Sequence, residues 1–142
     1  MKRKSLKRTL TAALLTLVAT AAYSQTNEMT AKIPFAFRAV GSDLPAGRYK
    51  VVPLAATSGA SRTMELLNID TGKSILILAR VPITESGDAR PRLIFRCGGE
   101  EGCSLATLWS GTGAGLEFST PALTASQRER RETIYLDRFK EK

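Results

Sequence analysis

The sequence predicts an all-β fold: a small antiparallel β-barrel or sandwich of about six to eight short strands, with one short helix near the C-terminus. Two observations lead to this prediction. Short segments in which apolar and polar residues alternate recur along the chain, as around Ile33, Phe35 and Phe37. Segments rich in Gly, Pro, Asp and Ser separate them at regular spacing, which is typical of antiparallel barrels and sandwiches. The chain has no internal repeat and no domain boundary, so we expect a single β domain over residues 32–142.

The expected strands lie between the turn-forming segments. They are Lys32–Arg38, Arg48–Leu54, Thr63–Ile69, Ser74–Val81, Arg92–Arg96, Ser104–Ser110 and Thr133–Phe139. Pro34 has no N–H to donate to a neighbouring strand, which predicts an edge position for the first of them. The apolar run Ile75–Leu78 predicts a central strand covered on both faces. In the sixth strand, the alternation places Leu105, Thr107 and Trp109 on one face.

The predicted helix depends on two overlapping patterns near the C-terminus. Thr124–Gln127 and Ser126–Glu129 both place a hydroxyl residue three positions before Gln or Glu. In such a capping box, the two side chains accept hydrogen bonds from N–H groups at the start of a helix. We therefore expect a helical turn or two that ends at about Glu132.

The N-terminus has the three-part layout of a secretory signal peptide. A basic head is followed by the apolar run Leu10–Ala22, and Ala22 and Ser24 are small residues suited to cleavage before Gln25. The apolar run is shorter than the roughly 20 residues that span a membrane. We expect residues 1–24 to be cleaved, residues 25–31 to form a flexible leader, and no transmembrane segment to remain. The expected location is the periplasm or the extracellular space.

Removal of the signal peptide changes the charge balance. Of the 21 basic and 13 acidic residues, five basic ones and no acidic one lie in residues 1–24. The remaining chain has 16 basic and 13 acidic residues, a net charge of +3 in place of +8. Its basic residues are scattered along the strands and are not interleaved with exposed aromatic residues, as a surface for single-stranded nucleic acid would require. We expect no nucleic-acid partner.

The composition also disfavours most enzyme classes. The chain contains no histidine, which removes the commonest general base and metal ligand. Gly72–Ser74 imitates the end of a phosphate-binding loop, but Leu67 occupies the position of its first glycine. Gly111–Gly115 has neither the spacing nor the setting of a dinucleotide-binding motif, and we expect a flexible link there. The sequence predicts no catalytic, cofactor-binding or metal-binding residue and no cofactor.

The two cysteines, Cys97 and Cys103, enclose a segment of Gly and Glu residues. In an oxidising compartment, an even pair at this spacing predicts a structural disulfide at a hairpin tip. Two free buried thiols or a redox pair are the alternatives, although a redox pair more often has the Cys-x-x-Cys spacing.

Two functional alternatives involve other residues. Asp70–Gly72 resembles the active-site triplet of aspartic peptidases, which would require a second Asp70 from a dimer partner. The same triplet is also typical of a hairpin turn, because Asp and Gly favour turn positions. A lipocalin-like carrier of an apolar ligand would instead have a cavity lined by aromatic and aliphatic side chains. The candidates are Phe35, Phe37, Leu93, Phe95 and Trp109.

Several short motifs resemble those of a group of small exported β proteins from acidobacteria. They are Ile33–Phe37, Leu44–Tyr49, Leu105–Trp109, Arg92–Phe95 and Ser126–Arg130, which follow the signal peptide. The Cys97–Cys103 loop departs from the pattern of the group. The resemblance implies a compact exported β domain and transfers no catalytic residue.

We therefore expect an exported, non-enzymatic protein that binds an envelope or extracellular partner or ligand, or is associated with the envelope. A dimeric peptidase that uses Asp70 and an apolar-ligand carrier are the alternatives.

Overall fold

The computed structural model describes residues 28–54, 63–84, 87–100, 102–111, 114–124 and 128–139. The predicted signal peptide lies outside these residues. They form twelve strands: β1 (Met29–Ile33), β2 (Phe37–Ala39), β3 (Ser42–Leu44), β4 (Gly47–Leu54), β5 (Thr63–Asn68), β6 (Ser74–Leu78), β7 (Val81–Thr84), β8 (Arg92–Cys97), β9 (Cys103–Trp109), β10 (Ala114–Glu117), β11 (Arg130–Tyr135) and β12 (Asp137–Arg138). The described residues include no helix that could span a membrane.

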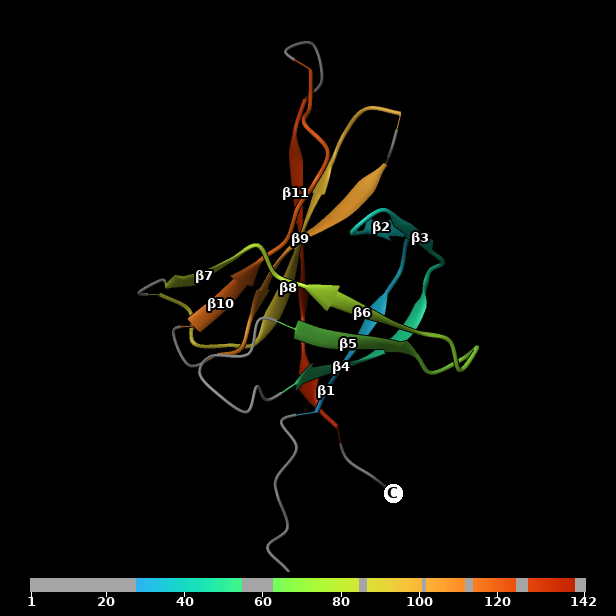
Figure 1. Ribbon diagram of the computed structural model, residues 1–142, viewed down its shortest axis with the longest axis vertical. Helices are drawn as coiled ribbons and strands as arrows, with labels where there is room; N and C mark the ends of the chain where they lie inside the picture. The colour runs from blue at the N-terminus through green and yellow to red at the C-terminus, as the bar shows by residue number, and fades with distance from the viewer. Residues whose placement is uncertain are drawn as a thin grey trace, which may run out of the picture.

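The strands form two sheets. Sheet A has the order β12-β1-β4-β5-β6, and sheet B has the order β11-β8-β9-β10-β7. The short β2 pairs in parallel with the start of β9 and antiparallel with β3, whereas the other pairs are antiparallel. In Figure 1, β4, β5 and β6 lie side by side, and β7 lies beside β10 in the other sheet. The all-β prediction is confirmed. Of the two architectures that it left open, the described strands form a sandwich and not a closed barrel.

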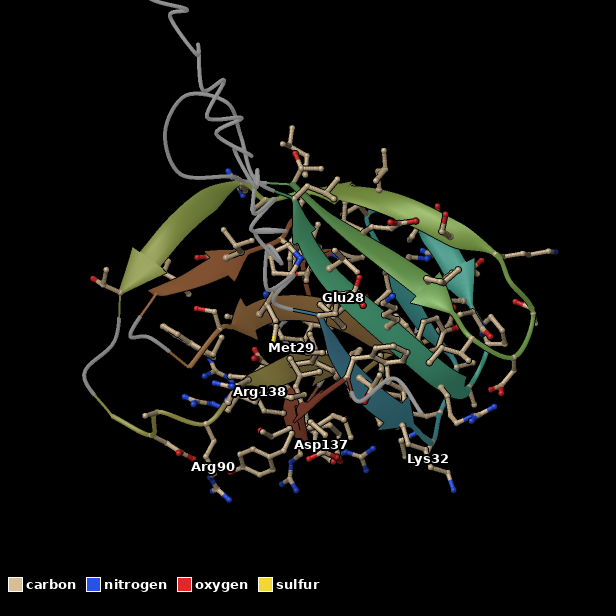
Figure 2. All side chains as sticks on the ribbon, turned by 90° about the horizontal axis from the view of Figure 1, so that it is seen from below. Glu28, Met29, Lys32, Arg90, Asp137 and Arg138 are labelled. Carbon is tan, nitrogen blue, oxygen red and sulfur yellow. A yellow bond between two sulfur atoms is a disulfide. The ribbon has the colours of Figure 1, made fainter. Side chains whose placement is uncertain are left out.

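Two short connections join the sheets at their ends. Only Ala79 and Arg80 separate β6, at the end of sheet A, from β7, at the end of sheet B. Only Leu136, which is buried, separates β11 from β12 at the opposite ends. Figure 2 shows the sandwich from below, with Lys32 and Arg90 pointing outward at its periphery. One core cluster takes residues from both sheets, among them Val51 of sheet A and Phe95 of sheet B, so the two sheets face a shared core, as a two-layer domain requires.

The centre of the core is an aromatic cluster. Phe95 on β8 has its ring centroid 5.2 Å from those of Phe35 and Phe37, in edge-to-face geometry. Phe37 in turn lies 5.3 Å from Tyr49 on β4. Such edge-to-face pairs stabilise a core beyond the effect of buried area alone. The alternation that predicted the strands thus places these rings between the sheets.

Tyr49 also closes the connection between β3 and β4. Its ring is fully buried, and its hydroxyl donates a hydrogen bond of 2.6 Å to the carbonyl oxygen of Pro45. Burial is the main cause that raises the pKa of this hydroxyl. The segment Leu44–Tyr49 therefore has a structural role. Pro45 fixes the backbone where the chain leaves β3, and the hydrogen bond from the tyrosine hydroxyl to Pro45 closes the connection to β4.

The N-terminal expectations need two corrections. Met29 and Ala31, expected in a flexible leader, are buried residues of β1. The single strand expected over residues 32–38 is two strands, with Pro34 in the break between them. β12 pairs only with Met29 and Thr30 of β1, so Lys32 and Ile33, next to Pro34, pair with β4 alone, which agrees with the edge position that Pro34 predicts. A proline that ends a strand is tolerated as well as one at an edge, since neither removes a ladder bond.

Two further predictions are wrong. The apolar run Ile75–Leu78 belongs to β6, which is an edge strand of sheet A and not a central one. Leu76 and Leu78 on its outer face are 68% and 65% exposed. The predicted C-terminal helix is also not present. Residues 121–124 and 128–129 are irregular, and residues 130–135 form β11, which pairs with β8 over six residues. This pairing outweighs the local capping signal; residues 125–127 lie outside the described part.

Candidate functional site

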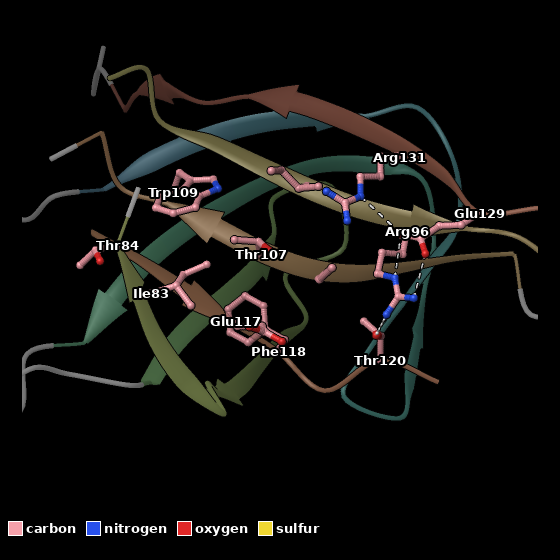
Figure 3. A pocket seen from close by; sticks show the side chains of 12 residues that line it. Ile83, Thr84, Arg96, Thr107, Trp109, Glu117, Phe118, Thr120, Glu129 and Arg131 are labelled. Carbon is pink, nitrogen blue, oxygen red and sulfur yellow. Dashed lines mark hydrogen bonds and ion pairs between the residues drawn. The ribbon is translucent and has the colours of Figure 1, made fainter. Parts of the chain in front are cut away.

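The outer face of sheet B carries a groove of about 580 Å³, which we call the sheet B groove. Its lining comes from all five strands of that sheet's main path and from the segments beside them. The lining residues are Ile83, Thr84, Ile94, Arg96, Ala106, Thr107, Trp109, Glu117, Phe118, Thr120, Glu129 and Arg131. Figure 3 shows Trp109 at one end, Thr107 in the middle, and Arg96 with Glu129 at the other end.

A β-bulge determines which side chains reach this groove. The β8–β9 register pairs Phe95 with Leu105 but Ile94 with Thr107, so Ala106 is an extra residue on β9. Leu105 therefore faces the core, whereas Thr107 and Trp109 face the groove. The prediction that all three share one face is wrong. A bulge re-aims the side chains that follow it, and such irregularities are common beside functional sites.

The apolar end of the groove is formed by Trp109, which is only 8% exposed although it lies on the outer face. Gly115, its partner across the β9–β10 ladder, has no side chain, and the indole occupies that space. A Cβ at this position would lie 2.8 Å from Cε3 of the ring. The guanidinium of Arg92 lies 5.4 Å from the ring centroid, within the range of a cation–π contact. Gly115, expected in a flexible link, is thus a strand residue, and its lack of a side chain leaves room for the indole of Trp109.

The polar end is an ion-pair network around Glu129. Arg96 donates to both carboxylate oxygens, with Nε–Oε1 3.1 Å and Nη2–Oε2 3.0 Å, and donates through Nη1 to the Thr120 hydroxyl at 3.0 Å. Arg131 adds a third bond to Oε1 at 3.3 Å. The bonds from Arg96 are the main cause that lowers the pKa of Glu129. A bidentate pair fixes the guanidinium plane, so this end of the groove presents donors in a defined geometry.

This arrangement suits binding better than chemistry. Arg96 and Glu129 form a bidentate ion pair with each other. The chain also has no histidine to act as a general base. The lining combines five apolar residues with seven polar or charged ones, and 580 Å³ lies within the usual range of volumes for ligand sites.

The structure gives Asp70 a structural role. Its carboxylate accepts hydrogen bonds from the backbone N–H of Arg48 at 2.9 Å and from the Arg48 guanidinium at 2.7 and 2.9 Å. The bond from the backbone N–H is the largest cause that lowers the pKa of Asp70. The side chain of Asn68 accepts from the N–H groups of residues 70 and 71, which closes the turn between β5 and β6. This geometry favours the hairpin-turn interpretation of the triplet.

The other residues singled out in the sequence fall into two groups. Cys97 and Cys103 are directly opposed on β8 and β9 and form a disulfide, as their spacing predicts. Phe37, Leu93 and Phe95 from the proposed carrier cavity are buried in the core. Phe35 packs against that core, and only Trp109 lies in the sheet B groove. The rings of Phe35 and Phe37 both contact the ring of Phe95 in the interior of the sandwich.

Sequence reasoning missed the sheet B groove. Residues from 83 to 131 form it, and no motif links them in the chain. The strand at residues 92–96 carried the available signal. Arg92 and Arg96 lie on the face of this strand that points away from the buried Leu93 and Phe95, which indicates a second face with charged residues.

Comparisons with known proteins add no identification. No protein-family model matches the chain, and no curated protein or solved structure matches it significantly.

Proposed function

We propose that this chain is an exported, non-enzymatic binding domain that takes a ligand or a segment of an envelope or extracellular partner into the sheet B groove. The observation that carries the proposal is the groove itself, with an apolar end at Trp109 and a bonded arginine network at Arg96. A molecule with an apolar part and a polar or anionic part fits this arrangement.

The rigidity of the lining supports binding. Ile94, Thr107 and Trp109 are held on adjacent, hydrogen-bonded strands, and Arg96 is held by Glu129 and Thr120. Side chains that are fixed before binding lose little conformational entropy when a ligand arrives. The groove therefore needs little rearrangement to accept a ligand.

Binding in the groove is testable because Trp109 is the only tryptophan of the chain. The probe is 1-anilinonaphthalene-8-sulfonate, which combines an apolar ring system with an anionic group. We expect its fluorescence to rise on titration and the Trp109 emission to fall by energy transfer. Thr107→Phe, which fills the middle of the groove, should weaken probe binding at least tenfold.

Thr133→Phe is the matched control, since Thr133 lies on the same outer face but does not line the groove. It should leave probe binding unchanged. Equal effects of the two substitutions, or no quenching of Trp109, would count against the groove as the binding site.

Export has a separate test. The basic head, apolar run and small residues at positions 22 and 24 support it, as does the resemblance to small exported proteins of acidobacteria. Protein recovered from the periplasm or medium should begin at Gln25. Leu15→Arg, which interrupts the apolar run, should leave the full-length chain in the cytoplasm. Processing and export that are unaffected by this substitution would refute the signal-peptide assignment.

A further inference from the structure

The free edge of sheet A differs from the other sheet edges in the described part of the chain. The end strands β11 and β12 carry charged residues, β3 has three residues including Asp43, and β7 contains Pro82, which has no N–H to donate. These are features by which proteins block the pairing of exposed edges. β6, Ser74–Leu78, has no charge and no proline, and its register with β5 is regular over five residue pairs. It is an unprotected edge.

The outer face at this edge carries exposed leucines, and Glu65 lies opposite Leu76 on the neighbouring strand. Leu76 and Leu78 are mostly exposed, and Leu67 on β5 lies half-buried in the adjoining row. Ile77 on the opposite face is fully buried, which fixes the orientation of the strand. An edge with open N–H and C=O groups and exposed leucines is a template for an added strand.

We propose that two copies of this chain pair through their β6 edges, antiparallel, about a two-fold axis at Leu76. In this register Leu76 lies opposite Leu76 of the second copy, Ile75 opposite Ile77, and Ser74 opposite Leu78. Every facing residue is apolar or carries a hydroxyl group, so the strand is complementary to itself, as a two-fold interface requires. Glu65, the nearest acidic residue, is one strand away from the edge. Its separation from the Glu65 of the second copy is then three strand spacings, or about 14 Å, which exceeds the screening length in physiological salt.

The size of the contact sets the expected strength. A five-residue strand pair with two exposed leucines from each copy falls below the roughly 1,200 Å² typical of stable complexes. The paired form is therefore a weak dimer, which assembles in a concentration-dependent way.

The test is sedimentation velocity of the protein expressed from its full coding sequence in an exporting host. The sedimentation coefficient of the wild-type protein should rise towards that of a dimer as the concentration increases. Leu76→Lys introduces an edge charge and should weaken association at least tenfold, as should Leu76→Thr, which keeps the preference for strand. Val40→Lys replaces an exposed apolar residue on the β2–β3 hairpin and should leave association unchanged. A monomer at every concentration, or a dimer that the Leu76 variants do not weaken, would overturn the proposal.

Cross-linking tests the register independently. Cys97 and Cys103 are already joined, so a single introduced cysteine reports only contacts between copies. Leu76→Cys should form a covalent dimer on mild oxidation, because the two-fold axis places the two cysteines opposite each other. Leu78→Cys, which faces Ser74 of the second copy, should form far less. More cross-linking at position 78 than at position 76 would refute the stated register.

Discussion

The close packing of the Trp109 indole against Gly115 leads to a quantitative prediction. In Gly115→Ala, the added Cβ would lie 2.8 and 2.9 Å from two carbons of the indole and 3.1 Å from Cγ1 of Ile83. Favourable carbon–carbon contacts begin near 3.5 Å, so the closest overlap is about 0.7 Å. Overpacking of this kind costs about 1–3 kcal/mol. Replacing a strand glycine by alanine otherwise gains about 0.5–1 kcal/mol, because glycine loses more backbone freedom on folding. We expect a net loss of about 1 kcal/mol in the free energy of unfolding.

A double-mutant cycle identifies the cause. In the Trp109→Leu background most of the overlap is gone, so Gly115→Ala should become neutral or slightly stabilising. The interaction energy between the two positions should then be about 1–2 kcal/mol, whereas independent positions add within about 0.5 kcal/mol. Urea denaturation followed by far-ultraviolet circular dichroism is the assay, because the Trp109→Leu chain lacks the fluorescent reporter.

Gly72→Ala is the control for this cycle. Gly72 has a φ of +72°, and an added Cβ would have nothing within 4 Å of it, so the cost of the substitution comes from the backbone alone. That cost should be the same in both backgrounds. If Gly115→Ala also costs the same in both, the indole does not require the glycine and the reasoning about the apolar end of the groove is wrong.

Three other changes have defined outcomes. Replacing Cys97 and Cys103 together by alanine should lower the free energy of unfolding by about 2.4 kcal/mol, the chain-entropy value for so short a loop; equal urea midpoints for this variant and the wild type would contradict it. Val40 has a φ of 44° in the two-residue turn between β2 and β3, a conformation that costs such a residue about 1–2 kcal/mol. Val40→Asn should raise stability by about 1 kcal/mol, since Asn-Gly suits this turn, and a lower urea midpoint would refute the estimate of strain. Hydrogen bonds from Arg90 lower the pKa of Asp88 from 3.8 to about 2, so the pair stabilises the fold above the ordinary pKa and is lost as the pH falls through about 2. In Asp88→Asn the dependence of the urea midpoint on pH should flatten across this window, and an unchanged slope would exclude this pair as its source.

Local patterns succeeded where neighbours in the chain determine the structure. The alternation around Phe35 and Phe37, the turn at Asp70 and the disulfide spacing of Cys97 and Cys103 were each interpreted correctly. The two cysteines and the residues of the Asp70 turn lie within a few residues of one another in the chain, whereas the alternation gives only the shared face of Phe35 and Phe37 and not their distant partner Phe95. The prediction of a central strand at Ile75–Leu78 failed, because an apolar run of residues can occur both in a strand covered on both faces and in a strand at an exposed edge. Only the order of the strands decides which face meets water.

The helix prediction failed for a related reason. A capping box reports the preference of an isolated segment, and residues 130–135 instead satisfy their backbone groups on β8. Pairing with a strand more than thirty residues away outweighs a local signal whose effect is about 1 kcal/mol.

By itself, the sequence determined that this protein is an all-β chain with short strands, a disulfide-closed hairpin and no histidine. The tertiary structure decided where the sheet B groove and the free edge of sheet A lie. The single-residue bulge at Ala106 turns Thr107 and Trp109 outward, and the path of β11 brings Glu129 and Arg131 to Arg96. The same strand order leaves Leu76 and Leu78 at a free edge. Side-chain direction in a strand reverses with every residue, so one inserted residue changes a face, and alternation alone does not reveal the insertion.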